Sequence, residues 1–141
     1  MGRIVAIDYG QKRTGIAVTD NLQLIANGLT TVASADVFAF LKEYAQKEKV
    51  ETFVVGLAKE TNNTPSVSMK YIAPFVKKLR LQFPDIEVVF FDERFTSLLA
   101  HRAMIDGGLR KKARQNKALV DKISATIILQ DYLEANKNLT H

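Results

Sequence analysis

The sequence predicts a single α/β domain built on a mixed five-stranded sheet flanked by helices. Three successive strand patterns within residues 3–32 support this prediction. Two compact apolar runs further along the chain also support it, and they are separated by segments whose apolar residues recur at helical spacing. This order of strands and helices is typical of α/β domains. The chain has 141 residues, of which 47% are hydrophobic and 25% charged, so we assign residues 1–141 to one globular domain.

The five predicted strands fall into two groups. Residues 3–8, 14–20 and 22–32 follow one another through short connections, and the last is interrupted by Asn27-Gly28. Short connections favour an antiparallel meander. Residues 52–57 and 86–91 are continuous apolar runs, as expected for strands that are buried on both faces, and we expect both to run parallel to the first strand.

Four helices are predicted between and after these strands. The first has apolar residues at helical spacing, with Ser34 as a candidate N-cap and an end near Lys49. The second begins at Pro65, because proline is favoured at the first helical position. A short helix over residues 96–105 and a final helix over residues 117–135 complete the prediction.

Composition excludes several classes of protein. The chain has no cysteine, which excludes disulfides, thiolate metal sites and cysteine nucleophiles, and only His101 and His141 could supply imidazole. A net charge of +5 favours an anionic partner. No apolar run approaches the ~20 residues needed to cross a bilayer, and no signal peptide is recognisable. We therefore expect a cytoplasmic protein with no membrane association.

Asp8 ends the first strand pattern and is followed by Gly10, Lys12 and Arg13. A carboxylate could hold a hard cation through its oxygens, and Gly10 permits either positive φ or a close approach of the backbone to a ligand. The two cations could meet a phosphate. An ordinary polar turn explains this motif equally well on its own, because Asp and Gly are common turn residues. The adjacent Tyr9 could either stack on a base or fill the core.

Further acidic residues are expected near Asp8. Ligands in such sheets bind beyond the carboxyl ends of parallel strands, and Asp92 and Glu93 follow the last predicted strand. Asp121 begins the apolar stripe of the final helix, although the helix dipole also explains an acid there. Glu93 could simply pair with Arg94 or Lys12 across the surface. Three carboxylates at one edge repel one another unless a cation lies between them, so we expect Mg²⁺ or Mn²⁺.

A basic segment precedes the final helix. It contains no acid, and its cations are Arg110, Lys111, Lys112, Arg114 and Lys117. Such residues could contact the phosphate backbone of a nucleic acid, together with Lys12, Arg13 and Arg94. A solvated charged run is the ordinary alternative.

Five motifs carry a resemblance to a known family. They are Asp8-x-Gly10-x-x-Arg13-x-Gly15-x-Ala17, Val54-Val55-Gly56-Leu57, Asp92-Glu93-Arg94-Phe95-Thr96-Ser97, Gly107-Gly108, and Asp121-x-x-Ser124-Ala125-x-x-Ile128-Leu129-x-x-Tyr132-Leu133. In this order they resemble the YqgF/RuvX family, which has the RNase H-like fold and comprises proposed Holliday junction resolvases and pre-16S ribosomal RNA nucleases. The resemblance implies that Asp8, Glu93 and Asp121 are the catalytic and metal-binding acids.

The chain departs from the family pattern over residues 58–63. Family members commonly read Pro-x-Asn-Met-Asp-Gly-Thr here, whereas this chain reads Ala58-Lys59-Glu60-Thr61-Asn62-Asn63-Thr64. The missing Asp and Gly leave the role of this segment open. Glu60 and Asp92 are the reserve metal ligands.

We therefore expect a Mg²⁺- or Mn²⁺-dependent nuclease that hydrolyses phosphodiester bonds in structured RNA or branched DNA. The main alternative is a non-catalytic RNA-binding factor for ribosome maturation with the same fold. A nucleotide phosphotransferase is a third hypothesis, because sugar-kinase and actin-like folds also begin with an Asp-x-Gly hairpin, but those folds need two such domains. A homodimer would suit a four-way junction, although the sequence shows no dedicated interface.

Overall fold

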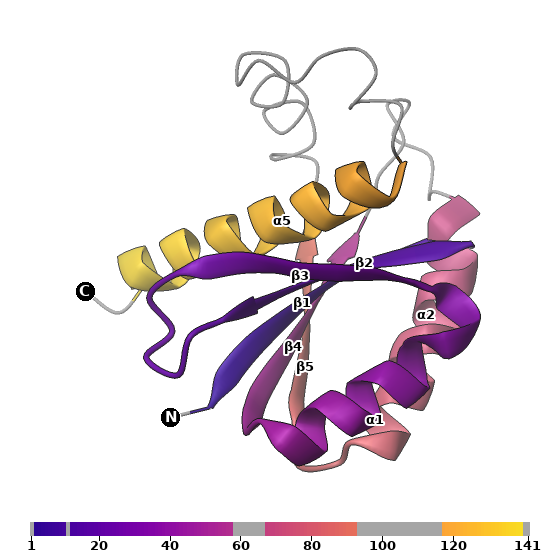
Figure 1. Cartoon of the computed structure of the whole chain (residues 1–141), viewed down its shortest axis with the longest axis horizontal. Coiled ribbons are helices and arrows are strands. Elements are labelled where there is room, and N and C mark those ends of the chain that lie inside the picture. Colours follow the sequence, from indigo (N-terminus) through magenta and orange to yellow (C-terminus); the bar gives the residue numbers. More distant parts are fainter. Residues whose placement is uncertain (1, 11, 58–66, 93–116, 140–141) are drawn as a thin grey trace.

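The computed structural model describes residues 2–10, 12–57, 67–92 and 117–139. One mixed sheet forms its centre, with α1 and α2 on one face and α5 across the other (Figure 1). The elements are β1 (Arg3–Tyr9), β2 (Arg13–Thr19), β3 (Ala26–Ala33), a short 3-10 helix η1 (Ser34–Asp36), α1 (Val37–Lys47), β4 (Val50–Leu57), α2 (Val67–Gln82), β5 (Glu87–Asp92) and α5 (Lys117–Leu139).

The strand order in the sheet is β3-β2-β1-β4-β5. Neighbours are antiparallel from β1 to β3, whereas β4 runs parallel to β1 and β5 runs parallel to β4. This confirms the predicted meander and the predicted parallel strands. The carboxyl ends of β1, β4 and β5 therefore lie at one edge of the sheet. The helix predicted over residues 96–105 and the start of the second helix at Pro65 lie outside the described residues.

Each face of the sheet has its own apolar core, because side chains alternate along a strand. On the face covered by α1 and α2, the buried residues include Val5, Ile7, Ile16, Phe53, Val55, Ile72 and Leu79. On the opposite face, α5 packs on the sheet, and the buried residues are Ile4, Ala6, Ala17, Val54, Ala125, Ile128 and Leu129. The position of Asp8, two residues after Ala6, is therefore on the α5 face.

Gly28 lies where α5 crosses β3. A Cβ atom at this position would be 2.8 Å from the Thr126 Oγ1 and 3.1 Å from the Lys122 Cγ. The Thr126 hydroxyl donates a hydrogen bond of 2.8 Å to the Lys122 carbonyl, which holds it in place. The register between β2 and β3 also shifts beside Gly28, so that β3 has an extra residue, Leu29. The glycine inside this strand pattern therefore marks a close helix crossing and a β-bulge.

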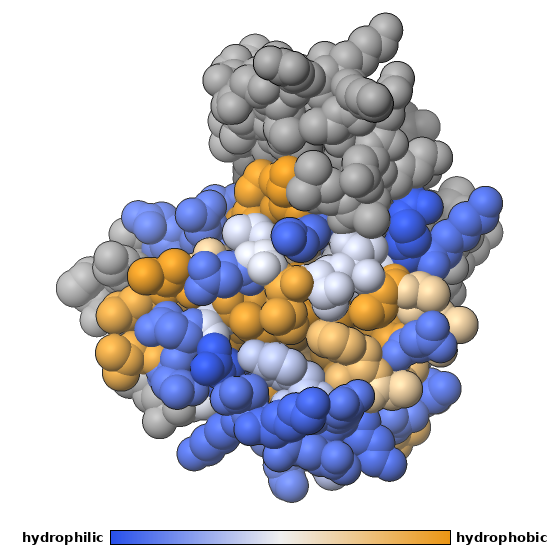
Figure 2. Space-filling model, in the orientation of Figure 1, coloured by the Kyte–Doolittle hydropathy of each residue, from blue (hydrophilic) through white to orange (hydrophobic). Residues whose placement is uncertain are grey.

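The β2–β3 connection differs from the prediction. Residues 22–25 were expected to be strand, but β3 begins only at Ala26. The Asp20 carboxylate accepts hydrogen bonds from the backbone N–H groups of Leu22 at 3.3 Å, Leu24 at 2.8 Å and Ile25 at 2.9 Å. These bonds turn the chain into a loop and leave its three aliphatic side chains exposed, and Figure 2 shows hydrophobic surface where the loop lies.

We expect this loop to respond to acid through Asp20. Hydrogen bonds from the Ile25 and Leu24 amides lower the pKa of Asp20 below its ordinary value of 3.8. Folding therefore favours the ionised carboxylate of Asp20. Its contribution to the stability of the folded protein is complete above the pKa of Asp20 in the unfolded chain, and it is lost as pH falls through the pKa of Asp20 in the folded protein. In an NMR titration the amide signals of Leu24 and Ile25 should shift with a midpoint below 3.8. The Asp20→Asn variant should show no such shift, and a midpoint above 3.8 in the wild type would contradict the prediction.

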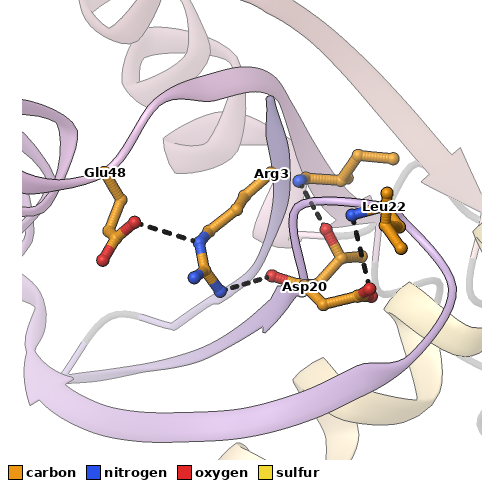
Figure 3. Close-up of polar contacts among 6 residues, drawn as sticks. Arg3, Asp20, Leu22 and Glu48 are labelled. Carbon is orange, nitrogen blue, oxygen red and sulfur yellow. Dashed lines mark hydrogen bonds and ion pairs between the residues drawn. The ribbon is translucent and has the colours of Figure 1, made fainter. Parts of the chain in front are cut away.

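Polar contacts also hold the amino edge of the sheet. Arg3, at the start of β1, forms an ion pair of 3.3 Å with Glu48 and donates a hydrogen bond of 2.9 Å to the Thr19 carbonyl (Figure 3). The Thr19 hydroxyl accepts a hydrogen bond of 2.9 Å from the Ile4 amide. This edge lies at the opposite end of β1 from Asp8. Among the described residues, no helix is both long enough and apolar enough to cross a membrane.

Candidate functional site

Asp8 is half-buried near the carboxyl end of β1 and lies between two glycines. In β2, Gly15 is directly aligned with it. In β4, Val55 is aligned with Ile7, and the next residue is Gly56. The residue aligned with Asp8 in β2 and the residue after Val55 in β4 are therefore both glycines. Both glycines are visible in the sequence. Their alignment with Asp8 depends on the register of β2 and β4 against β1, which the sequence pattern does not determine.

The turn after Asp8 requires a glycine at position 10. The Gly10 amide donates a hydrogen bond of 3.0 Å to the Arg13 carbonyl. A Cβ atom on Gly10 would lie only 2.6 Å from that carbonyl oxygen, and the φ angle of Gly10 is outside the left-handed region. Gly10 therefore does not have the positive φ that was considered, and its close backbone contact is with Arg13, whereas the close approach to a ligand stays a prediction.

Ser34 anchors this turn to the start of α1. Its hydroxyl donates a hydrogen bond of 2.6 Å to the Gly10 carbonyl and lies 2.8 Å from the Thr14 hydroxyl. A serine has a single hydroxyl proton, so Thr14 is the donor in the second bond. The Ser34 amide donates to the Lys12 carbonyl at 3.0 Å. Ser34 thereby fixes the backbone that follows Asp8.

The prediction that Ser34 is the N-cap of the first helix was therefore wrong. The N-cap residue of α1 is Asp36, whose side chain makes no capping hydrogen bond. Ser34 instead lies in η1, and its hydroxyl is used in contacts with the β1–β2 turn. A serine just before a helical pattern is a common N-cap, so the local sequence favoured that role. The prediction was wrong because the Ser34 hydroxyl bonds to residues that are distant along the chain.

Removal of the Ser34 hydroxyl should destabilise the protein. We expect Ser34→Ala to cost about 1–3 kcal/mol, because it leaves the Gly10 carbonyl and the buried Thr14 hydroxyl without this partner. Equilibrium urea unfolding of the wild type, Ser34→Ala, Thr14→Val and the double variant would measure the coupling. The double variant should cost less than the sum of the single variants by about 1 kcal/mol. Strictly additive costs would show that the two hydroxyls do not interact.

The structure brings three predicted acidic positions toward one region of the fold. Asp92 ends β5, aligned with Leu57 at the end of β4, so it lies at the same sheet edge as Asp8. Asp121 is near the beginning of α5, and Ala125, one turn later, is buried on the sheet. Figure 1 shows this end of α5 on the side of the sheet where β1 ends. The strand pairing thus places Asp8 and Asp92 at the same sheet edge, and the roles assigned to Asp8, Asp92 and Asp121 stay predictions.

The remaining predicted site residues are only partly described. For Asp92, Asp121 and Lys117 the structure gives the strand or helix position and not the side chain. Lys12 is exposed and Arg13 half-buried, both next to the turn after Asp8. Several predicted residues lie outside the described segments, namely Glu93, Glu60, Arg94, Arg110, Lys111, Lys112 and Arg114. Within the described segments, no three Asp, Glu, His or Cys residues are grouped as a metal site would require.

Tyr9 packs on the face opposite Asp8. Its ring stacks on Phe75 of α2, with 4.0 Å between centroids and 12° between planes. Phe75 also contacts Phe38 of α1 at a centroid distance of 5.2 Å. Of the two roles considered for Tyr9, the structure supports packing against the core.

Comparison with known proteins identifies the family. The family model described as "RuvX: Holliday junction resolvase" matches residues 2–135. The chain belongs to the RuvX family. A relative from Phocaeicola vulgatus is 64% identical over 137 residues, which cover 97% of this chain and 99% of the relative. Another from Flavobacterium psychrophilum is 60% identical over 133 residues, which cover 94% and 97%. Both are named "Putative pre-16S rRNA nuclease".

Solved structures similar to this RuvX chain include two of RuvC from Thermus thermophilus. One, a complex with a Holliday junction substrate, has a TM-score of 0.58 at 14% identity and covers 96% of each chain. The other has a TM-score of 0.55 at 15% identity, with the same coverage. At this identity the similarity establishes the fold alone. It confirms the RNase H-like architecture that was expected for this RuvX chain.

Proposed function

We propose that this RuvX chain is a divalent-metal-dependent nuclease that hydrolyses phosphodiester bonds in structured nucleic acid. The substrate would be either the 5′ end of precursor 16S rRNA or a Holliday junction, and residues 1–141 would form one nuclease domain. The observation that carries the proposal is the position of Asp8 at the carboxyl edge of the parallel strands, with Asp92 at the same edge. The names of the relatives support the same chemistry.

We assign metal binding and catalysis to Asp8, Glu93 and Asp121, with Asp92 and Glu60 as reserve ligands. The surroundings of Asp8 fit a hydrated Mg²⁺ or Mn²⁺, because the carboxylate supplies oxygen ligands and its neighbours in β2 and β4 are glycines. When bound, such ions lower the pKa of a coordinated water and neutralise charge at the phosphate. Asp8 itself would be held in position by β1 and by the turn that Ser34 anchors.

Cations around this edge would hold the nucleic-acid backbone. Lys12 is exposed on the turn that follows Asp8, where a phosphate bound near the carboxylate could meet it. We assign the same role to Arg13, Arg94, Arg110, Lys111, Lys112, Arg114 and Lys117. Contacts of this kind fix the position of a backbone and do not distinguish base sequence.

The proposal is tested with two matched panels of substrates, precursor 16S rRNA fragments and four-way DNA junctions. Wild-type protein should cleave one panel in Mg²⁺ or Mn²⁺ and neither panel in EDTA. Cleavage of only one of the two panels would identify the class of nucleic acid that is the substrate. Tight RNA binding without cleavage of either panel in either metal would contradict the nuclease assignment and support a non-catalytic factor in ribosome maturation.

We further propose a cytoplasmic location and, if the substrate is a four-way junction, a homodimer. A two-fold dimer would present one carboxylate edge to each of two symmetry-related strands of the junction. Analytical ultracentrifugation with and without a junction would test this. A single protein copy on each junction would contradict the dimer.

A further inference from the structure

A groove of about 480 Å³ lies between α2 and β5, on the face of the sheet opposite the position of Asp8. Its lining residues are Ala73, Val76, Lys77, Arg80, Leu81 and Phe90. Leu81 and Phe90 are exposed by 74% and 39%, and the Lys77 and Arg80 side chains are also exposed. The groove thus combines an apolar lining, an aromatic ring and two positive charges.

The aromatic ring and one cation are held together. The Arg80 guanidinium lies 5.9 Å from the centroid of the Phe90 ring, and its Nη2 donates a hydrogen bond of 3.4 Å to the Val88 carbonyl. Arg80 is therefore directed along β5, and its charge stays beside the ring. The contacts of Arg80 with Phe90 and Val88 hold these two side chains in place, which reduces the side-chain ordering that binding would require there.

The groove lies on the α2 face of the sheet, whereas the position of Asp8 is on the α5 face, so the two are related around the β5 edge. Phe90 is aligned with Val55 of β4, and Val55 is aligned with Ile7, the residue before Asp8. Because neighbouring strands are about 4.8 Å apart, Phe90 lies level with Ile7 and about 10 Å to the side. β5 is the outermost strand of the sheet on this side. A nucleic-acid strand that leaves the carboxyl edge around β5 would reach the groove.

From these features we infer that the groove binds a single-stranded segment of the nucleic-acid substrate, next to the part that is cleaved. Base faces would pack on Phe90 and Leu81, and phosphates would meet Lys77 and Arg80. A duplex hides its base faces by stacking, whereas an unpaired strand can offer them to an aromatic and apolar surface. This inference rests on the proposed function, because it assigns the groove to the same substrate.

Lys77→Ala tests the phosphate contact. Affinity is measured by fluorescence anisotropy in EDTA at several salt concentrations, with an RNA duplex carrying a single-stranded flank and with the same duplex made blunt. Lys77→Ala should reduce the log-log salt slope by about 0.7 for the flanked RNA and leave the blunt duplex unchanged. Lys42→Ala, which removes an exposed lysine of α1, is the matched control and should change neither slope.

Phe90→Leu tests the base contact while keeping an apolar side chain. It should weaken binding of the flanked RNA about tenfold, which corresponds to about 1.4 kcal/mol, and leave the blunt duplex unchanged. Equal losses on both RNAs, or no loss on either, would overturn the inference. Binding of an acidic peptide that is lost in both variants, with RNA binding intact, would assign the groove to a protein partner and also overturn it.

These binding measurements are separate from the test of cleavage. Because they are made in EDTA, they require no turnover and report only on the groove. Failure to cleave any substrate in Mg²⁺ or Mn²⁺ would contradict the proposed function. An unchanged affinity of the Lys77 and Phe90 variants for the flanked RNA would contradict only the proposed role of the groove in binding single-stranded RNA.

Discussion

Asp8→Asn is expected to reduce Mg²⁺-dependent cleavage at least about a hundredfold, with nucleic-acid binding retained. The amide has nearly the same shape as the carboxylate but lacks its charge and one of its ligand oxygens, and a bound ion contributes several kcal/mol to the rate. The residues of β2 and β4 beside Asp8 are Gly15 and Gly56, and glycine has no side chain that could serve as a substitute ligand. Single-turnover cleavage in Mg²⁺ and Mn²⁺ would measure the loss, and anisotropy in EDTA would measure binding.

Asp85→Asn provides the matched control. Asp85 is exposed and lies between α2 and β5, before the amino end of β5, which is the opposite edge of the sheet from Asp8. The same chemical change there should leave cleavage within about twofold of the wild type, since surface substitutions of this kind usually change free energies by less than ~0.5 kcal/mol. Cleavage that is unchanged in Asp8→Asn would disprove the role of Asp8 in catalysis.

Leu129→Ala is expected to lower the free energy of unfolding by about 2–5 kcal/mol. Leu129 is fully buried in α5 and packs in the same cluster as Ala6 and Val54 of the sheet. The truncated side chain would leave a cavity between the helix and the sheet, and the small residues below it have no longer side chain to fill the space. Equilibrium urea unfolding would measure the change.

Leu81→Ala is the control for this second prediction, because it makes the same substitution at a leucine that is 74% exposed. Its cost should be within about 0.5 kcal/mol of zero. Similar losses for Leu129→Ala and Leu81→Ala would contradict the view that α5 is held on the sheet mainly by apolar burial.

Most of the sheet could be predicted from the sequence, because continuous apolar runs and short connections restrict how strands pair. The loop over residues 22–25 could not be predicted, because its aliphatic residues look like a strand until the Asp20 carboxylate is seen to bind their amides. Ser34 was misassigned for a similar reason. Its hydroxyl contacts Gly10 and Thr14, which lie 24 and 20 residues earlier in the chain.

For the candidate site, the sequence allowed us to predict which acidic residues lie at the ends of the parallel strands. Asp8 and Asp92 could be placed at one edge because topology alone determines where parallel strands finish. The effect of Gly15 and Gly56 depends on strand register, which periodicity does not determine. The assignments of Glu93 and Glu60 to metal binding remain predictions, because both residues lie outside the described segments.

The packing of α5 has a consequence for synthesis of the protein. β1 ends at Tyr9, whereas α5 begins at Lys117, so the described helix that covers one face of the sheet is made much later than the strand below it. A growing chain can pair β1, β2 and β3 early, but Ile4, Ala6 and Ala17 stay uncovered until α5 has left the ribosome. The proposed site needs both Asp8 and Asp121. A chain that ends before α5 would therefore lack part of the proposed site.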